Sequence, residues 1–185
     1  MKKGFTMIEL IFVIVILGIL ASVAVPRLAS TREDAEISAT VANLRTLLSD
    51  ANAYYITKGY FVRGTETARW RDFTNVALRL NDGKLMQGAH PANQSAYIAA
   101  GGKNCIEINI VDRTNTTPAY VSVKKANTGD YICSEIHKAD PVKAYLESRL
   151  PGVSSANTAQ GDEGRIALGS SARIYNTGTT TNPKP

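Results

Sequence analysis

The stretch MKKGFTMIELIFVIVILGILASVAV, residues 1–25, decides how this chain is organised. Residues 5–25 are almost wholly apolar and contain one charged side chain, that of Glu9. As a helix they would be ~31 Å long, enough to cross the ~30 Å hydrocarbon core of a bilayer. Lys2 and Lys3 precede the apolar run. The positive-inside rule therefore predicts a cytoplasmic N-terminus, with the rest of the chain on the other side of the membrane.

Two ordinary interpretations of this stretch compete. A secretory signal peptide fits the basic start, the apolar run and the small residues Ser22-Val23-Ala24 near a cleavage site. A plain single-span anchor fits as well. Glu9 argues against both, because an intramembrane carboxylate costs ~2.5–3.5 kcal/mol at a helix centre and points to a function.

The heptapeptide GFTMIEL, residues 4–10, resembles the prepilin (class III) signal of type IV pilins and type II secretion pseudopilins. The resemblance implies that a prepilin peptidase cuts between Gly4 and Phe5 on the cytoplasmic side. It also implies that Phe5 becomes the N-methylated first residue and that Glu9 is the glutamate at the fifth mature position. Gly18 and Pro26 likewise stand where this family often has a glycine and a helix-bending proline.

The chemistry of this stretch is consistent with polymerisation. The cut precedes the apolar run, so the mature chain keeps its hydrophobic helix. A buried, unpaired Glu9 is costly, and the new amine at Phe5 of a neighbouring subunit can supply its partner. Gly18 allows helices to approach closely, and Pro26 removes a helix donor, which predicts a kink near the membrane exit.

The helix is predicted to continue beyond the membrane to about Lys58, with Gly59 at the C-cap. Its apolar positions recur in steps of three and four: Ile37, Val41, Leu44, Leu48, Ala51 and Tyr55. This pattern defines an amphipathic segment over residues 26–58. A coiled-coil seam and packing against the chain's own head both fit the stripe, and we favour packing against the head.

Residues 59–176 are predicted to form an α+β head. Alternation of apolar residues predicts strands at Cys105–Val111 and Ala119–Lys124 and a third short strand at Tyr131–Cys133. These strands would form a small antiparallel sheet against the long helix. The other expected elements are a short helix capped by Asp72 with Phe73, Val76, Ala77 and Leu80 on one face, a helix over Asp140–Leu150, a linker at 151–164, an edge strand at 165–175 and a disordered tail at 177–185.

Composition argues against several classes of function. Lys2 and Lys3 contribute two charges to the net charge of +5, and the other basic residues are dispersed, so no nucleic-acid partner is expected. No catalytic motif, cofactor motif or metal-ligand spacing is apparent, so the sequence predicts no enzyme, no cofactor and no metal. Cys105 and Cys133 are expected to form a disulfide outside the cytoplasm. A thiol site that pairs Cys105 with His90 or His137 is the alternative, and Asp162-Glu163 is expected to be a solvated loop rather than a calcium site.

The resemblance implies a structural subunit that waits in the inner membrane as a single-pass protein with a periplasmic head. Its implied partners are the prepilin peptidase, other pilin or pseudopilin subunits, and an inner-membrane assembly platform. The filament would be a periplasmic type II secretion pseudopilus or an extracellular type IV pilus, and the motif does not separate them. The alternative is a conventionally secreted or anchored binding domain, for which a mature N-terminus near Val25 would be evidence.

Overall fold

The computed structural model describes residues 4–63, 65–87, 90–114, 117–150 and 163–169, with the backbone alone at positions 26, 29 and 30. The chain has two compact units, Met1–Glu36 and Ile37–Pro185. The linker expected at 151–164 lies almost entirely outside the described residues, and the tail expected at 177–185 lies wholly outside them.

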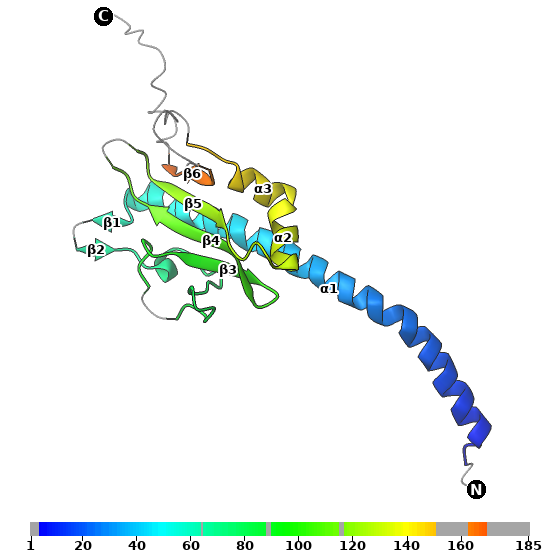
Figure 1. Ribbon diagram of the computed structural model, residues 1–185. Helices are drawn as coiled ribbons and strands as arrows, with labels where there is room; N and C mark the ends of the chain where they lie inside the picture. Colours follow the sequence, from blue (N-terminus) through cyan, green and yellow to red (C-terminus); the bar gives the residue numbers. More distant parts are fainter. Residues whose placement is uncertain (1–3, 64, 88–89, 115–116, 151–162, 170–185) are drawn as a thin grey trace, which may run out of the picture. The chain divides into compact units, whose positions relative to one another are not determined.

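Helix α1 spans Met7–Lys58 and belongs to both units (Figure 1). It ends where the sequence predicts. Gly59 has φ +80°, and its N–H donates a hydrogen bond of 2.7 Å to the carbonyl oxygen of Tyr55. Glycine suits this position because it adopts the left-handed conformation without a Cβ penalty.

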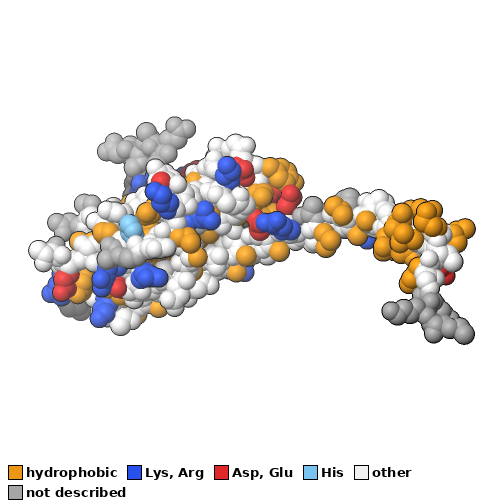
Figure 2. All heavy atoms as spheres, turned by 90° about the horizontal axis from the view of Figure 1, so that it is seen from below, with side chains coloured by type: hydrophobic (Ala, Val, Ile, Leu, Met, Phe, Trp, Pro, Cys, Tyr) orange, Lys and Arg blue, Asp and Glu red, His pale blue; other side chains and the backbone are white. Residues whose placement is uncertain are grey.

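The first unit presents its apolar side chains outward. Met7–Val25 has a mean hydropathy of 2.9 and is entirely exposed, and Figure 2 shows hydrophobic side chains gathered on this part of the chain. Inside the span, the Ser22 hydroxyl donates to the carbonyl oxygen of Ile19 at 2.7 Å, so this polar group is satisfied within the helix. By length and composition the segment is a candidate membrane span.

The second unit contains a four-stranded antiparallel sheet in the order β3-β4-β5-β6. Its strands are β3 (Ala96–Ala100), β4 (Lys103–Val111), β5 (Tyr120–Lys125) and β6 (Arg165–Ala167). The two strands predicted by alternation are therefore confirmed as β4 and β5, with Ile108 opposite Val123. A separate hairpin consists of β1 (Val62–Arg63) and β2 (Glu66–Thr67).

The apolar stripe of α1 is buried in the head. Leu44 and Ala51 are fully buried, and they share one core with Ile106 and Ile108 of the sheet. Leu47, which the predicted stripe omitted, is also fully buried. The α+β, pilin-like architecture and the packing of α1 against its own head are thus confirmed, and the coiled-coil interpretation of the stripe is wrong.

The helix expected after Asp72 is wrong. Asp72 instead ends a 3-10 turn, η1 (Trp70–Asp72), and its carboxylate accepts a hydrogen bond of 2.8 Å from the backbone N–H of Arg69. Residues 73–80 form no helix, and Arg79 exchanges two backbone hydrogen bonds with Tyr97 of β3, at 2.8 and 2.9 Å. Pairing at the sheet edge therefore overrides a weak helical pattern.

The third strand expected at Tyr131–Cys133 is also wrong. These residues begin helix α2 (Tyr131–Lys138), which is followed by α3 (Asp140–Leu146). The carboxylate of Asp130 accepts a hydrogen bond of 3.2 Å from the Cys133 N–H and so caps α2. Helix α3 begins where predicted, and the expected edge strand is confirmed over Arg165–Ala167, whereas residues 170–175 lie outside the described part.

Candidate functional site

The Gly4–Phe5 peptide bond lies ahead of the first residue of α1 and is exposed. The side chain of Phe5 is 88% exposed, and no atom lies within 4 Å of the position a Cβ on Gly4 would occupy. A protease needs its target bond in an accessible, non-helical segment. In this structure the bond that the sequence motif singles out meets both conditions.

The side chains of Thr6 and Glu9 bond to each other at the start of the helix. One Glu9 carboxylate oxygen accepts hydrogen bonds from the Thr6 N–H at 2.8 Å and from the Thr6 hydroxyl at 2.7 Å. In return the Glu9 N–H contacts the Thr6 hydroxyl oxygen at 3.4 Å. Thr6-Met7-Ile8-Glu9 is thus a capping box, in which two otherwise orphan donors at a helix N-terminus are satisfied.

The hydrogen bonds from Thr6 correct one expectation about Glu9. Glu9 was expected to lack a partner before assembly, but the structure gives its carboxylate local partners within the same chain. The spacing of Thr6 and Glu9 carried the necessary signal, because threonine followed by glutamate three residues later is typical of a helix start.

Gly18 lies on an open face of the first unit. No atom is found within 4 Å of the position its Cβ would occupy. The helical backbone continues through Pro26, whose side chain is outside the described set. Close packing at Gly18 and a kink at Pro26 remain predictions.

Cys105 on β4 and Cys133 on α2 are joined by a disulfide. His137, one turn after Cys133, places its Nε2 at 2.7 Å from the carbonyl oxygen of Cys105. A carbonyl oxygen only accepts, so Nε2 carries the hydrogen.

The backbone carbonyl oxygen of His90 accepts a hydrogen bond of 3.1 Å from the Trp70 N–H. The two sulfurs, which the alternative thiol site would need, are therefore bonded to each other.

Within the described residues, no group of three or more His, Cys, Asp or Glu side chains is close enough to hold a metal ion. Glu163, which the sequence placed in a solvated loop, forms an ion pair of 2.9 Å with Arg149, and Asp162 lies outside the described residues.

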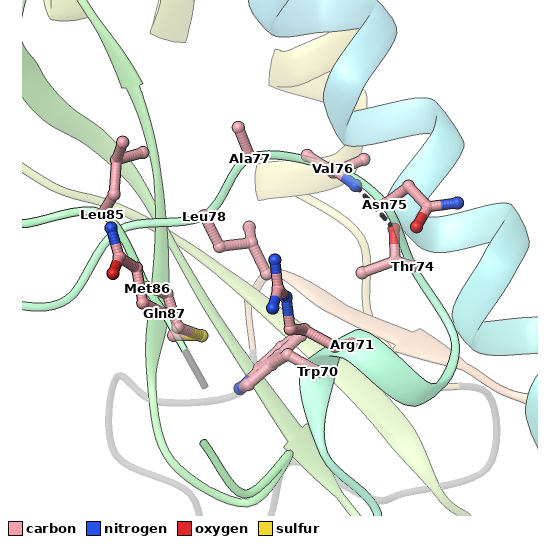
Figure 3. Close-up of a pocket in the computed structure, with 10 residues that line it drawn as sticks. All are labelled: Trp70, Arg71, Thr74, Asn75, Val76, Ala77, Leu78, Leu85, Met86 and Gln87. Carbon is pink, nitrogen blue, oxygen red and sulfur yellow. Dashed lines mark hydrogen bonds between the residues drawn. The ribbon is translucent and has the colours of Figure 1, made fainter. Parts of the chain in front are cut away.

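A groove of about 520 Å³ opens beside η1 (Figure 3). Its lining consists of Trp70, Arg71 and residues 74–78 and 85–87. Trp70 is 1% exposed, and its Nε1–H donates to the Gln94 carbonyl oxygen at 3.2 Å, so it supports the groove from within the core. The Thr74 hydroxyl donates a hydrogen bond of 2.8 Å to the carboxylate of Asp50 and so connects this side of the groove to α1.

Comparisons with known proteins match a motif at the N-terminus and relate the chain to proteins of secretion systems and fimbriae. Residues 1–25 match the model of the prokaryotic N-terminal methylation motif. The type II secretion system core protein G of Dickeya chrysanthemi is 42% identical over 53 residues, which are 29% of this chain and 35% of that protein. The fimbrial protein of Neisseria meningitidis serogroup A is 31% identical over 93 residues, which are 50% of this chain and 52% of that protein.

The core protein G of Klebsiella pneumoniae is 42% identical over 53 residues as well, or 29% of this chain and 38% of that protein. The chain therefore spans between about a third and a half of the length of these relatives. No solved structure matches the chain. By its motif and its similarity to these relatives the chain is pilin-like or pseudopilin-like.

Proposed function

We propose that this chain is a structural filament subunit that is anchored and assembled through its N-terminal helix. One observation carries the proposal. An exposed Gly4–Phe5 bond stands immediately before a capped helix whose first 19 residues, Met7–Val25, are apolar and exposed. A conventional signal would be removed together with its apolar run, whereas a cut at this bond leaves the run on the mature chain.

Processing by a prepilin peptidase would hydrolyse the Gly4–Phe5 amide, release residues 1–4 and leave a free amine on Phe5. Methylation of that amine keeps its positive charge. Residues 5–25 would then hold the subunit in the inner membrane, with the head in the periplasm until assembly. The lysines at positions 2 and 3 support this orientation.

Assembly would place the Glu9 carboxylate of one subunit near the amine of the next. The isolated chain satisfies Glu9 with hydrogen bonds from Thr6. The bonds from Thr6 leave the carboxylate with its negative charge, whereas a cationic amine neutralises it, and opposite charges attract most strongly where water is excluded. It would also fix the axial register of helices whose apolar side chains alone permit sliding.

The filament is a type IV pilus or a type II secretion pseudopilus, and the similarity to both core protein G and a fimbrial protein supports this common class. Its partners would be the prepilin peptidase, other subunits of the same filament and an assembly platform in the inner membrane. In this proposal the subunit carries out no chemistry of its own.

Intact-mass spectrometry of the membrane-bound protein tests the processing step. The expected product lacks Met1 to Gly4 and carries one additional methyl group. A Gly4→Leu variant, which fills the exposed position next to the bond, is expected to keep its leader. A soluble product that begins near Val25 would instead indicate a conventional secretory signal and overturn the proposal.

A further inference from the structure

A hollow of about 560 Å³ opens on the head where β5, α2 and α3 meet. We call it the basic hollow, because its charged lining residues are four cations and two carboxylates: Lys125, Lys138, Lys143, Arg149, Glu147 and Glu163. Exposed cations around a concave surface attract an acidic partner most strongly where they are not already neutralised.

Two of the four cations are neutralised inside the head. Lys138 lies 2.7 Å from a carboxylate oxygen of Glu135, and this contact raises the pKa of the lysine. Arg149 lies 2.9 Å from Glu163.

The other two cations are less strongly neutralised. Lys143 lies 3.9 Å from Glu147, at the outer limit of an ion pair, and both side chains are more than half exposed. For Lys125, which is exposed at the end of β5, the described residues offer no ion pair. The basic hollow therefore presents one cation without an ion pair among the described residues, Lys125, and one, Lys143, that is weakly paired with Glu147.

The first unit ends in a short acidic segment with the opposite charge. In the sequence Arg32-Glu33-Asp34-Ala35-Glu36, Arg32 and Glu36 lie 3.3 Å apart and neutralise each other. Glu33 and Asp34 are exposed, and no ion pair involves them within the described part of the chain. Neighbouring side chains on a helix diverge by ~100°, so these two carboxylates can reach different rims of one hollow.

We infer that the basic hollow receives Glu33 and Asp34 of α1 from a second copy of this chain. Lys125, which has no ion pair within the described residues, and Lys143, which is only weakly paired with Glu147, are opposite in sign to the two exposed carboxylates. This inference rests on the filament function proposed above, because subunits stacked with an axial shift bring the α1 of one copy past the head of another. The contact adds a second register-setting interaction, on the aqueous side of the membrane.

Charge reversal on the full-length chain in its source organism tests the contact. Lys125→Glu with Lys143→Glu, and separately Glu33→Lys with Asp34→Lys, are each expected to lower the yield of sheared filaments by ~10-fold or more. All four changes together restore opposite charges and are expected to return the yield to within ~3-fold of wild type. Lys103→Glu, on an exposed lysine of β4 outside the hollow, serves as the matched control.

A zero-length carbodiimide crosslinker applied to wild-type filaments provides direct evidence. It is expected to give a dimer whose crosslinked peptides join Lys125 or Lys143 to Glu33 or Asp34. Leader removal, membrane level and the disulfide are checked on every variant, so that misfolding is recognised.

Two results would overturn the inference while leaving the filament function intact. The first is that the charge-reversed variants assemble as well as the Lys103→Glu control. The other is a hollow variant that stays defective when combined with the α1 reversal, which would mean that the hollow binds something else, such as an anionic lipid surface. Absence of filaments from the correctly processed wild type would refute the proposed function, and this inference with it.

Discussion

Glu9 has two competing ways to satisfy its carboxylate, and they can be separated by substitution. Within one chain it accepts hydrogen bonds from the N–H and hydroxyl of Thr6. Between chains it would pair with the amine of Phe5. A glutamine can still accept the Thr6 N–H, as capping boxes with glutamine do, but it carries no charge.

Glu9→Gln and Glu9→Ala are therefore both expected to lose their leader normally and to give at least ~10-fold fewer filaments, as follows from losing a poorly solvated ion pair. Thr6→Ala removes only the hydroxyl bonds and is expected to assemble far better than either. Sheared-filament assays with leader cleavage checked on the same samples make the comparison. Normal assembly of Glu9→Gln with failure of Thr6→Ala would mean that helix capping, rather than charge pairing, is what matters.

Gly164 is a position at which the head should tolerate replacement poorly. It has φ +77°, and a Cβ there would collide with the carbonyl oxygen of Val123. Gly164→Ala is expected to lower the free energy of unfolding by about 2–4 kcal/mol, from backbone strain and steric overlap together. Gly83, at φ +80° with open space around it, isolates the strain, and Gly83→Ala should cost only about 1 kcal/mol.

Urea denaturation of the full-length protein in detergent measures both variants. The fluorescence of Trp70 reports on the core, since this residue is the only tryptophan and is 1% exposed. Equal losses for the two variants would show that backbone conformation alone accounts for the effect at Gly164.

The long helix and the central strands were predictable because their signals are strong and local. In α1 the apolar steps and Gly59 define the face and the end of the helix. In β4, the alternation of Ile106, Ile108 and Ile110 matches their burial on one side of the sheet. Periodicity extended over many residues leaves few alternative structures.

The elements that were missed have weaker or ambiguous signals. Strand β3, with the sequence AYIAA, offers little β propensity and is held by its pairing with β4. Tyr131-Ile132-Cys133 is apolar enough for a strand, but Asp130 before it is a helix cap. At the candidate site, Gly4, Phe5 and Glu9 followed from the motif, whereas the basic hollow depends on three segments that only the fold brings together.

The disulfide between β4 and α2 closes a large loop, with a sequence separation of 28 residues. Changing Cys105 and Cys133 to alanine together is expected to lower the free energy of unfolding by about 3–4 kcal/mol in the chain-entropy model. Urea denaturation of the double variant, beside the wild type with and without reductant, tests this. A stability equal to that of the oxidised wild type, or two free thiols in the denatured and unreduced protein, would refute it.

The two units of the molecule differ in the exposure of their apolar side chains. Residues 7–25 expose every apolar side chain, whereas the second half of α1 buries its own stripe beneath the sheet. The apolar run ends at Val25, and the exposed charged residues 32–34 follow it shortly before the division at Glu36.

A chain that begins at Arg27 lacks the exposed apolar run and keeps the helix segment that the head covers. It is therefore expected to be soluble and monomeric by analytical ultracentrifugation, with the far-ultraviolet spectrum of a mixed α+β protein. Adding back residues 7–25 should restore the need for detergent. Stable dimers of the shortened chain would mean that a surface of the head or of residues 27–36 associates without the membrane helix.

The link between Cys105 and Cys133 also has a mechanical consequence. In the proposed filament, tension would pass from subunit to subunit, and a head that unfolded under load would lengthen as its strands were pulled apart. An extended residue spans at most ~3.3–3.6 Å. The disulfide, with its sequence separation of 28 residues, therefore prevents each subunit from lengthening by about 90–100 Å through this segment. With the bond intact, β4, β5 and the start of α2 cannot be extended between those two points. An overloaded filament of the proposed kind would therefore separate at its subunit contacts rather than lengthen through this part of its heads.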